Sequence, residues 1–168
     1  MNARSLIAGF AVRATLALVM TMVGTQAMAA ASLAPEATRV LHSARSADLY
    51  SLEPWIEPDA KAQQLDGYAI LGKVSMTKSQ THAAVSEIDK SMAAWEEGPV
   101  AACFDPRHAL RIRSEGHTYD FLICYACEGI QVYKDGTFVA SSDVRGNPGV
   151  LNAMLRDGKV PLSTTGDR

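Results

Sequence analysis

The chain has 168 residues, of which 48% are hydrophobic and 20% charged, and its formal net charge at pH 7 is −2. This length suits one domain with a substantial hydrophobic core. The mildly acidic balance argues against sequence-independent binding of nucleic acid, which needs a basic patch to displace phosphate counterions. The composition therefore favours one globular domain that binds no nucleic acid.

The N-terminal segment has the pattern of a cleaved Sec-type signal peptide. Arg4 and Arg13 form its positive part, and residues 14–23 form an uncharged apolar run. That run, about ten residues, is shorter than the roughly 20 that a membrane-spanning helix needs. Ala27 and Ala29 provide the small residues of a cleavage site. Cleavage after Ala29 leaves 139 residues with a net charge of −4, because two of the 16 basic residues are removed. We expect a periplasmic or secreted protein with no membrane span after signal removal.

The first half of the remaining chain alternates between helical and strand patterns. Pro35 suits the first position of a helix, and apolar residues recur at helical spacing as far as Ala44. Residues 48–52 alternate enough to predict a short strand. Residues 68–76 are apolar on both faces, which is typical of a buried strand.

The clearest helix begins at Thr77. Thr77 and Gln80 have the spacing of a capping box, in which each side chain binds a free backbone N–H group of the first turn. The apolar residues that follow recur at three- and four-residue steps and predict one buried stripe: Ala84, Val85, Ile88, Met92 and Trp95. Gly98-Pro99 predicts the end of this helix.

From about residue 100 the pattern is that of a β-sheet. Residues 109–113 alternate, and 118–126 are apolar on both faces, so the second segment is expected to be a central strand. Residues 131–134 and 137–140 flank Asp135-Gly136, a dipeptide that favours a tight hairpin turn.

A final helix completes the set of predicted elements. Asn147-Pro148 predicts its start and Gly158 its end. Since no repeated βαβ unit is present, we predict an α+β domain: a mainly antiparallel sheet of about five or six strands, with two to three helices packed on one face. The expected divisions are a signal peptide (1–29), a single α+β domain (30–162) and a disordered tail (163–168).

All three cysteines of the chain lie between Cys103 and Cys127. In an oxidising compartment the simplest expectation is a structural disulfide that joins Cys103 to Cys124 or Cys127 and leaves the third cysteine buried. A redox-active C-x-x-C pair is less favoured, because such pairs lie at a helix N-terminus and this one follows a strand.

Zinc is the alternative for the same residues. Thiolate and imidazole ligands suit zinc, and the candidate set is Cys103, His108, Cys124 and Cys127, with His117 as a substitute. On a regular strand, residues i and i+3 point to opposite faces, so the C-x-x-C pair shares a metal only if the chain turns within 125–129. In the simpler interpretation the protein holds no metal or other cofactor.

Asp105-Pro106-Arg107-His108 is the second candidate site. Arg107 and His108 lie beside a cysteine, where they are candidates to bind an anion or activate a thiol. The simpler interpretation is a turn, with Arg107 paired to an acid such as Asp120. The chain has no nucleophile elbow, phosphate-binding glycine loop, metalloprotease motif or paired-carboxylate spacing. No catalytic residue is therefore predicted, and a non-enzymatic role is favoured.

Two segments, C-F-D-P-R-H-A-L-R at 103–111 and D-F-L-I-C-Y-A-C at 120–127, resemble the motifs of a known family. It is an uncharacterised family of small bacterial exported proteins with C-F-x-P-R-H and D-x-x-I-C-[FY]-x-C elements, and the resemblance covers residues 48–162. The family has no assigned activity, so the resemblance implies export and a bacterial source but no catalytic role. The positions that it marks are Cys103, Arg107, His108, Cys124 and Cys127.

Two functional hypotheses follow. The first is a non-enzymatic binding protein of the inhibitor or immunity type, whose partner is another envelope or secreted protein. The second is a zinc- or thiol-dependent protein that uses Cys103, His108, Cys124 and Cys127. The state of the three cysteines is the observation that separates them.

Overall fold

A computed structural model of the protein describes residues 32–55, 63–98 and 102–164. The elements in chain order are α1 (Pro35–Ser43), β1 (Ala47–Glu53), β2 (Gln64–Leu65), β3 (Tyr68–Met76), α2 (Lys78–Ala93), β4 (His108–Ser114), β5 (His117–Cys124), β6 (Gly129–Lys134), β7 (Thr137–Asp143) and α3 (Gly149–Asp157). The seven strands form one antiparallel, curled sheet in the order β2-β3-β1-β4-β5-β6-β7. The predicted α+β class is confirmed, with seven strands in place of five or six. The predicted signal peptide lies outside the described residues.

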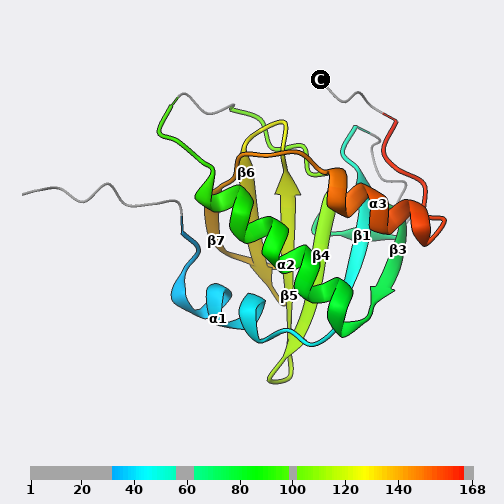
Figure 1. Ribbon diagram of the computed structural model, residues 1–168, viewed down its shortest axis with the longest axis horizontal. Coiled ribbons are helices and arrows are strands. Elements are labelled where there is room, and N and C mark those ends of the chain that lie inside the picture. Colours follow the sequence, from blue (N-terminus) through cyan, green and yellow to red (C-terminus); the bar gives the residue numbers. More distant parts are fainter. Residues whose placement is uncertain (1–31, 56–62, 99–101, 165–168) are drawn as a thin grey trace, which may run out of the picture.

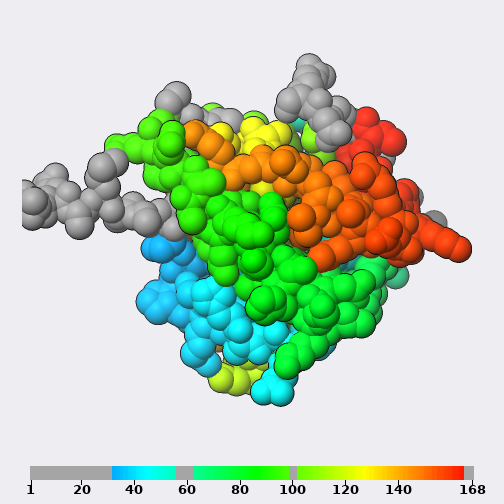
Figure 2. Space-filling view, viewed as in Figure 1, coloured from blue at the N-terminus to red at the C-terminus, as the bar shows by residue number. Residues whose placement is uncertain are grey.

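All three helices pack on the same face of the sheet, as predicted (Figure 1). Figure 2 shows them side by side over that face, with α2 running diagonally between α1 and α3. The main core lies beneath them. It is built from buried residues of the helices, such as Leu41, Ile88 and Leu151, and from sheet residues such as Phe121 and Ile130.

Helix α2 forms where its local sequence predicts it. The Thr77 hydroxyl accepts a hydrogen bond from the Gln80 backbone N–H, and the Gln80 side chain accepts one from the Thr77 N–H, so both halves of the capping box are present. These bonds satisfy N–H groups that would otherwise lack a partner in the first turn. Ala84, Val85 and Ile88 are buried from the predicted stripe.

The opposite face of the sheet carries a second, smaller core. Its fully packed members are Tyr50, Leu52, Leu65, Ala109 and Leu122. This core explains why the β5 segment is apolar on both faces: Phe121 and Ile123 lie under the helices, and Leu122 lies in the second core. Strand β5 is therefore an interior strand, flanked by β4 and β6.

Tight turns with left-handed residues connect the hairpins. In the predicted Asp135-Gly136 turn between β6 and β7, the two φ angles are 49° and 77°. The Asp66-Gly67 turn between β2 and β3 has φ angles of 48° and 92°. Aspartate and glycine tolerate this region better than most residues. Strand β2 was not predicted, because two residues are too few to show a periodic pattern.

The first residues of the predicted tail contact strand β1. The Ser163 hydroxyl donates to Glu53 Oε2 at 3.0 Å, and the Thr164 N–H donates to the same oxygen at 3.2 Å. A buried acid on β1 therefore holds the chain after α3 against the sheet. The rest of the predicted tail, 165–168, lies outside the described residues.

Candidate functional site

The segment before β4 holds Cys103 against the start of β6. The Tyr68 hydroxyl donates a hydrogen bond of 3.1 Å to the Phe104 carbonyl oxygen. The Phe104 ring lies over Gly129, where a side-chain Cβ would stand 3.6 Å from the ring. A Cβ at this distance would make ordinary van der Waals contact, so the ring packs directly on the strand, and this packing places Cys103 beside the β5–β6 turn.

Cys124 and Cys127 form a disulfide across that turn. Their Cα atoms are 5.2 Å apart, within the usual range for a disulfide. The turn is possible because Glu128 adopts a φ of 53°, and its N–H donates to the Tyr125 carbonyl oxygen at 3.3 Å. The sequence pattern extended the strand two residues further, whereas the structure ends β5 at Cys124.

The predicted pairing of Cys103 with Cys124 or Cys127 is therefore wrong in this structure. Cys103 is a free, exposed cysteine, although its Sγ lies only 3.5 Å from the Sγ of Cys127. The prediction failed because a regular strand separates residues i and i+3 onto opposite faces, and the turn after Cys124 removes that separation. The three sulfurs form one cluster in which a free thiol touches a disulfide.

The sulfurs differ in burial and share backbone donors. Cys124 and Cys127 are 2% and 5% exposed. The Asp105 N–H donates to Cys127 Sγ at 3.2 Å, and the Cys127 N–H donates to Cys124 Sγ at 3.1 Å. Each sulfur of the disulfide thus accepts one hydrogen bond from a backbone N–H group.

The Asp105 carboxylate completes a group of potential metal ligands. Its oxygen and the sulfurs of Cys103 and Cys127 all lie within 4.8 Å of one another. His108, a member of the predicted zinc set, is not in this group: its Nε2 lies 2.8 Å from Asn152 Oδ1 on α3. The structure thus brings the three predicted cysteines together and directs the histidine elsewhere.

His117, the predicted substitute ligand, is also remote from the cysteines in the sheet. It begins β5, at the opposite end of that strand from Cys124. Its Nδ1 lies 2.6 Å from Asp135 Oδ2, across the β6–β7 turn. His117 therefore pairs with Asp135 at the surface and does not belong to the sulfur cluster.

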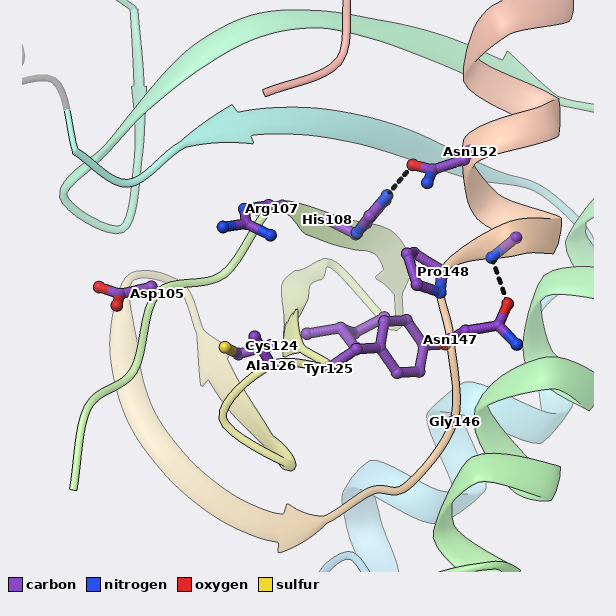
Figure 3. Close-up of a pocket in the computed structure, with 12 residues that line it drawn as sticks. Asp105, Arg107, His108, Cys124, Tyr125, Ala126, Gly146, Asn147, Pro148 and Asn152 are labelled. Carbon is purple, nitrogen blue, oxygen red and sulfur yellow. Dashed lines mark hydrogen bonds between the residues drawn. The ribbon is translucent and has the colours of Figure 1, made fainter. Parts of the chain in front are cut away.

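A pocket of about 480 Å³ adjoins the disulfide. It lies between the start of β4, the β5–β6 turn and the loop before α3, and Cys124 is part of its wall. Figure 3 shows Asp105 and Arg107 on one side of this pocket, and Asn147 and Pro148 on the other. The volume falls within the range of small-molecule sites, roughly 300–1,000 Å³.

Polar and aromatic groups from three elements line the pocket. His108 is buried and packs edge-on against Tyr125, with the ring centroids 6.3 Å apart. Burial raises the pKa of the Tyr125 hydroxyl. Asn147 Oδ1 accepts the Gly149 N–H at 2.9 Å, so helix α3 begins after Pro148 and not at it. Sequence reasoning treated Asn147-Pro148 as a helix start alone and missed its place in the pocket.

Arg107 occupies the pocket wall and does not pair with Asp120 as suggested from the sequence. Asp120 is bound by Arg111, whose Nε and terminal nitrogen contact the two carboxylate oxygens at 2.6 and 2.7 Å. The reason is register, because Arg111 and Asp120 face each other directly across β4 and β5. Arg107 precedes β4 and is half-buried.

The fold and the site define an α+β protein with a three-cysteine cluster beside a pocket of small-molecule size. Comparisons with protein-family models, with curated proteins and with solved structures found no match to this chain. Within the described residues, no helix has both the length and the apolar character needed to cross a membrane. The disulfide is compatible with an extracellular location.

Proposed function

We propose that this protein is an exported thiol–disulfide exchange protein, in which Cys103 carries the disulfide of Cys124 and Cys127 to the surface. The observation that carries the proposal is the distance of 3.5 Å between the sulfurs of Cys103 and Cys127. Disulfide exchange is the attack of a thiolate on a disulfide sulfur, and the rate depends on access. A free cysteine held against a disulfide supplies the attacking group within the same molecule.

The burial of the disulfide explains the proposed role of Cys103. The disulfide sulfurs belong to residues that are 2% and 5% exposed, so a thiol carried by another folded protein cannot reach them easily. Cys103 is exposed and touches Cys127. Transfer of the bond to Cys103 therefore converts a protected disulfide into an accessible one.

The chemistry proceeds in balanced steps. The Cys103 thiol loses its proton to solvent, and its thiolate attacks Cys127 Sγ. The bond to Cys124 breaks, and Cys124 leaves as a thiolate. A substrate thiolate then attacks Cys103 Sγ, forms a mixed disulfide and releases Cys127 as a thiolate. A second substrate thiolate attacks the substrate sulfur of the mixed disulfide and frees Cys103. Two substrate thiols have become a disulfide, and the C-x-x-C pair has been reduced.

Two backbone N–H groups are placed to stabilise the thiolates that leave in these steps. When Cys124 leaves, the Cys127 N–H is already 3.1 Å from its sulfur. When Cys127 leaves, the Asp105 N–H is 3.2 Å away. A thiolate stabilised in this way is a better leaving group, because the rate of exchange rises as the pKa of the leaving thiol falls.

The rate of reduction tests the proposal. Oxidised mature protein and its Cys103→Ser variant are treated with a reduced folded protein dithiol of the thioredoxin type, and free thiols are counted by alkylation and mass spectrometry. We expect the variant to be reduced at least about tenfold more slowly, because a protein reductant is too large to enter the pocket and must reach a buried disulfide directly. Ser163→Ala, remote from the sulfurs along the chain, serves as the control. Equal rates for the wild type and Cys103→Ser would refute the relay.

The proposal includes the compartment and the partner expected from the sequence. Stable disulfides belong to oxidising compartments. Residues 1–29 are proposed to direct export and to be removed after Ala29, and the substrate is proposed to be another envelope or secreted protein with two thiols. The mass of the protein recovered from the periplasm or medium tests the cleavage. A mass that includes Met1 would contradict it. The hypothesis of a non-enzymatic inhibitor or immunity protein stays a prediction.

A second candidate function is zinc binding by the reduced site. It is favoured by the group formed by Cys103, Asp105 and Cys127, whose ligand atoms lie within 4.8 Å of one another. Reduction would add the Cys124 thiolate as a fourth ligand, and thiolates and carboxylates both bind zinc. Titration of reduced protein with cobalt, read by thiolate-to-metal absorption, tests it. The Cys103→Ser variant should lose the absorption, and an unchanged spectrum in that variant would exclude Cys103 as a ligand.

A further inference from the structure

We infer that the 480 Å³ pocket binds a small amino-acid disulfide, of the cystine or glutathione disulfide class, which reoxidises the reduced C-x-x-C pair. The inference rests on the proposed function and names the oxidant for the same site. It starts from the position of the disulfide between two hollows. Cys124 lines the 480 Å³ pocket, whereas Cys103 and Cys127 line a separate depression of about 310 Å³ formed with β6 and β7.

The two hollows give access to different cysteines. The exposed thiol of Cys103 serves the outer depression, where a large substrate can approach. The inner pocket presents Cys124, which Cys103 does not contact among the described hydrogen bonds. Two separate hollows allow one partner to donate the disulfide while another receives it. The pocket provides the second entrance.

The charges of the pocket fit an amino-acid group. Asp105 and Arg107 both line the pocket, and Figure 3 shows them on the side away from Asn147, so this part of the wall carries one anion and one cation. An α-amino acid carries the complementary pair, a carboxylate for the guanidinium and an ammonium for the carboxylate. Arg107 has five N–H donors, so it can hold a protein partner and a ligand together. The Asn147 amide and the Tyr125 ring provide polar and apolar walls for the rest of the molecule.

The position of Asp105 also limits how far the ligand sulfur must reach. Asp105 lines the pocket, and its carboxylate lies within 4.8 Å of the sulfurs of Cys103 and Cys127. A ligand whose ammonium group binds this carboxylate has its own disulfide a few bonds from the sulfur cluster, and Cys124 is the member of that cluster that lines the pocket. The class of ligand is therefore set by two features together, the charge pair and the adjacent sulfurs.

The reoxidation step is balanced as follows. In the reduced protein the Cys124 thiolate attacks one sulfur of the bound disulfide, and the first half of the ligand leaves as a thiolate. The Cys127 thiolate then attacks Cys124 Sγ and expels the second half. The C-x-x-C disulfide is restored, and the two ligand thiolates take up the two protons that the cysteines gave to solvent.

Equilibrium binding to the oxidised Cys103→Ser protein tests the inference without any reaction, because this variant has no free thiol. Three probes are compared by calorimetry: glutathione disulfide, cystamine, which lacks carboxylates, and 3,3′-dithiodipropionate, which lacks ammonium groups. We expect glutathione disulfide to bind at least about tenfold more tightly than cystamine. Equal affinities for all three probes, or no binding of glutathione disulfide, would overturn the inference.

Charge-removing variants test whether Arg107 and Asp105 bind the ligand. In the Cys103→Ser background, Arg107→Gln should lower the affinity for glutathione disulfide about tenfold or more. Arg107→Lys should recover most of that affinity if the fold is intact. Asp105→Asn should lower the affinity for glutathione disulfide but not that for 3,3′-dithiodipropionate, which has no ammonium group. Arg113→Gln is the control, because that arginine has a 64% exposed side chain and does not line the pocket. If Arg107→Gln and Arg113→Gln bind alike, the charge argument is wrong.

The result is separable from that of the relay test. Reduction by a protein dithiol involves no pocket ligand, so slow reduction of Cys103→Ser together with absent binding of glutathione disulfide would leave the relay in place and refute the assigned oxidant. Binding of glutathione disulfide together with equal reduction rates for the wild type and Cys103→Ser would refute the relay. The pocket would then bind an amino-acid ligand for another purpose, and the reoxidation step would be refuted as well.

Discussion

The turn between β2 and β3 carries an acid whose titration should control stability. Asp66 is half-buried and lies next to Asp120, which is 2% exposed and already bound by Arg111. Burial, followed by the negative charge of Asp120 and a hydrogen bond to it, raises the pKa of Asp66 from 3.8 to about 6, although Arg111 opposes this. A protonated carboxyl can donate to Asp120, whereas an ionised one repels it.

The sign of the effect follows from linkage. Below about pH 4, Asp66 is protonated in both the folded and the unfolded state. As pH rises from about 4 through about 6, the unfolded state ionises first, so the free energy of unfolding falls. Two pKa units correspond to about 3 kcal/mol. Because the side chain is partly exposed, solvent screening should reduce this to about 1–2 kcal/mol.

Replacement of Asp66 by asparagine removes the titration and keeps the donor. The amide N–H can bind Asp120 at every pH, and asparagine tolerates the φ of 48° at this position. We expect Asp66→Asn to be more stable than the wild type by about 1–2 kcal/mol at pH 8, with a smaller difference at pH 4.5. The assay is urea unfolding, followed by tryptophan fluorescence, at both pH values.

Asp135→Asn is a matched control. It occupies the same first position of an Asp-Gly turn at a φ of 49°. The Thr118 N–H and then the His117 ring lower the pKa of Asp135, so ionisation stabilises the fold and the substitution should be destabilising at pH 8. If both substitutions shift stability in the same direction, or if the Asp66→Asn difference is independent of pH, the reasoning about Asp66 is wrong.

Three stability predictions follow from other contacts, each measured by urea or thermal unfolding. Thr77→Ala removes the capping box and should cost about 1 kcal/mol, whereas Thr77→Ser should keep most of the stability; equal losses would show that the cap contributes little. Arg111→Met leaves the buried Asp120 carboxylate without its partner and should cost roughly 3–5 kcal/mol at pH 8; a cost of less than about 1 kcal/mol would contradict this. Gly158→Ala places a Cβ against Val74 and should cost about 1–3 kcal/mol, which the smaller Val74→Ala partner should relieve.

Local signals in the sequence account for the elements that were predicted well. The capping box at Thr77 and the apolar stripe that follows define α2 without reference to the rest of the chain. Asp135-Gly136 defines the last hairpin in the same way. The two apolar faces of the β5 segment indicated an interior strand, since an edge or surface strand would expose one of them. Each of these features depends on residues fewer than about 20 positions apart.

The errors arose where distant segments meet. The place of Asp66 beside Asp120 depends on the short strand β2, which pairs only with β3 and has no pattern of its own. Asp120 was assigned to Arg107 by type of charge, but register gives it to Arg111. The pocket likewise joins the start of β4 to the loop before α3, and no periodic signal links those segments.

One exchange step converts the disulfide between Cys124 and Cys127 into one between Cys103 and Cys127, and the two bonds should stabilise the fold to different extents. Cys124 and Cys127 are three residues apart, whereas Cys103 and Cys127 are 24 apart. In the chain-entropy model the short loop is worth about 2 kcal/mol and the long loop about 3.5 kcal/mol. The bond between Cys103 and Cys127, one of the two pairings expected from the sequence, should therefore stabilise the fold more than the bond that the structure shows.

Single variants separate the two bonds. Cys124→Ser leaves Cys103 and Cys127 with their sulfurs 3.5 Å apart and should form that disulfide spontaneously, whereas Cys103→Ser keeps the observed one. For each variant, the free energy of unfolding is measured in the oxidised and the reduced protein, so that the cost of the serine cancels. We expect oxidation to stabilise Cys124→Ser by about 1.5 kcal/mol more than Cys103→Ser. If Cys124→Ser retains two free thiols in air, Cys103 cannot reach Cys127 for bond formation, and the relay would lose its first step.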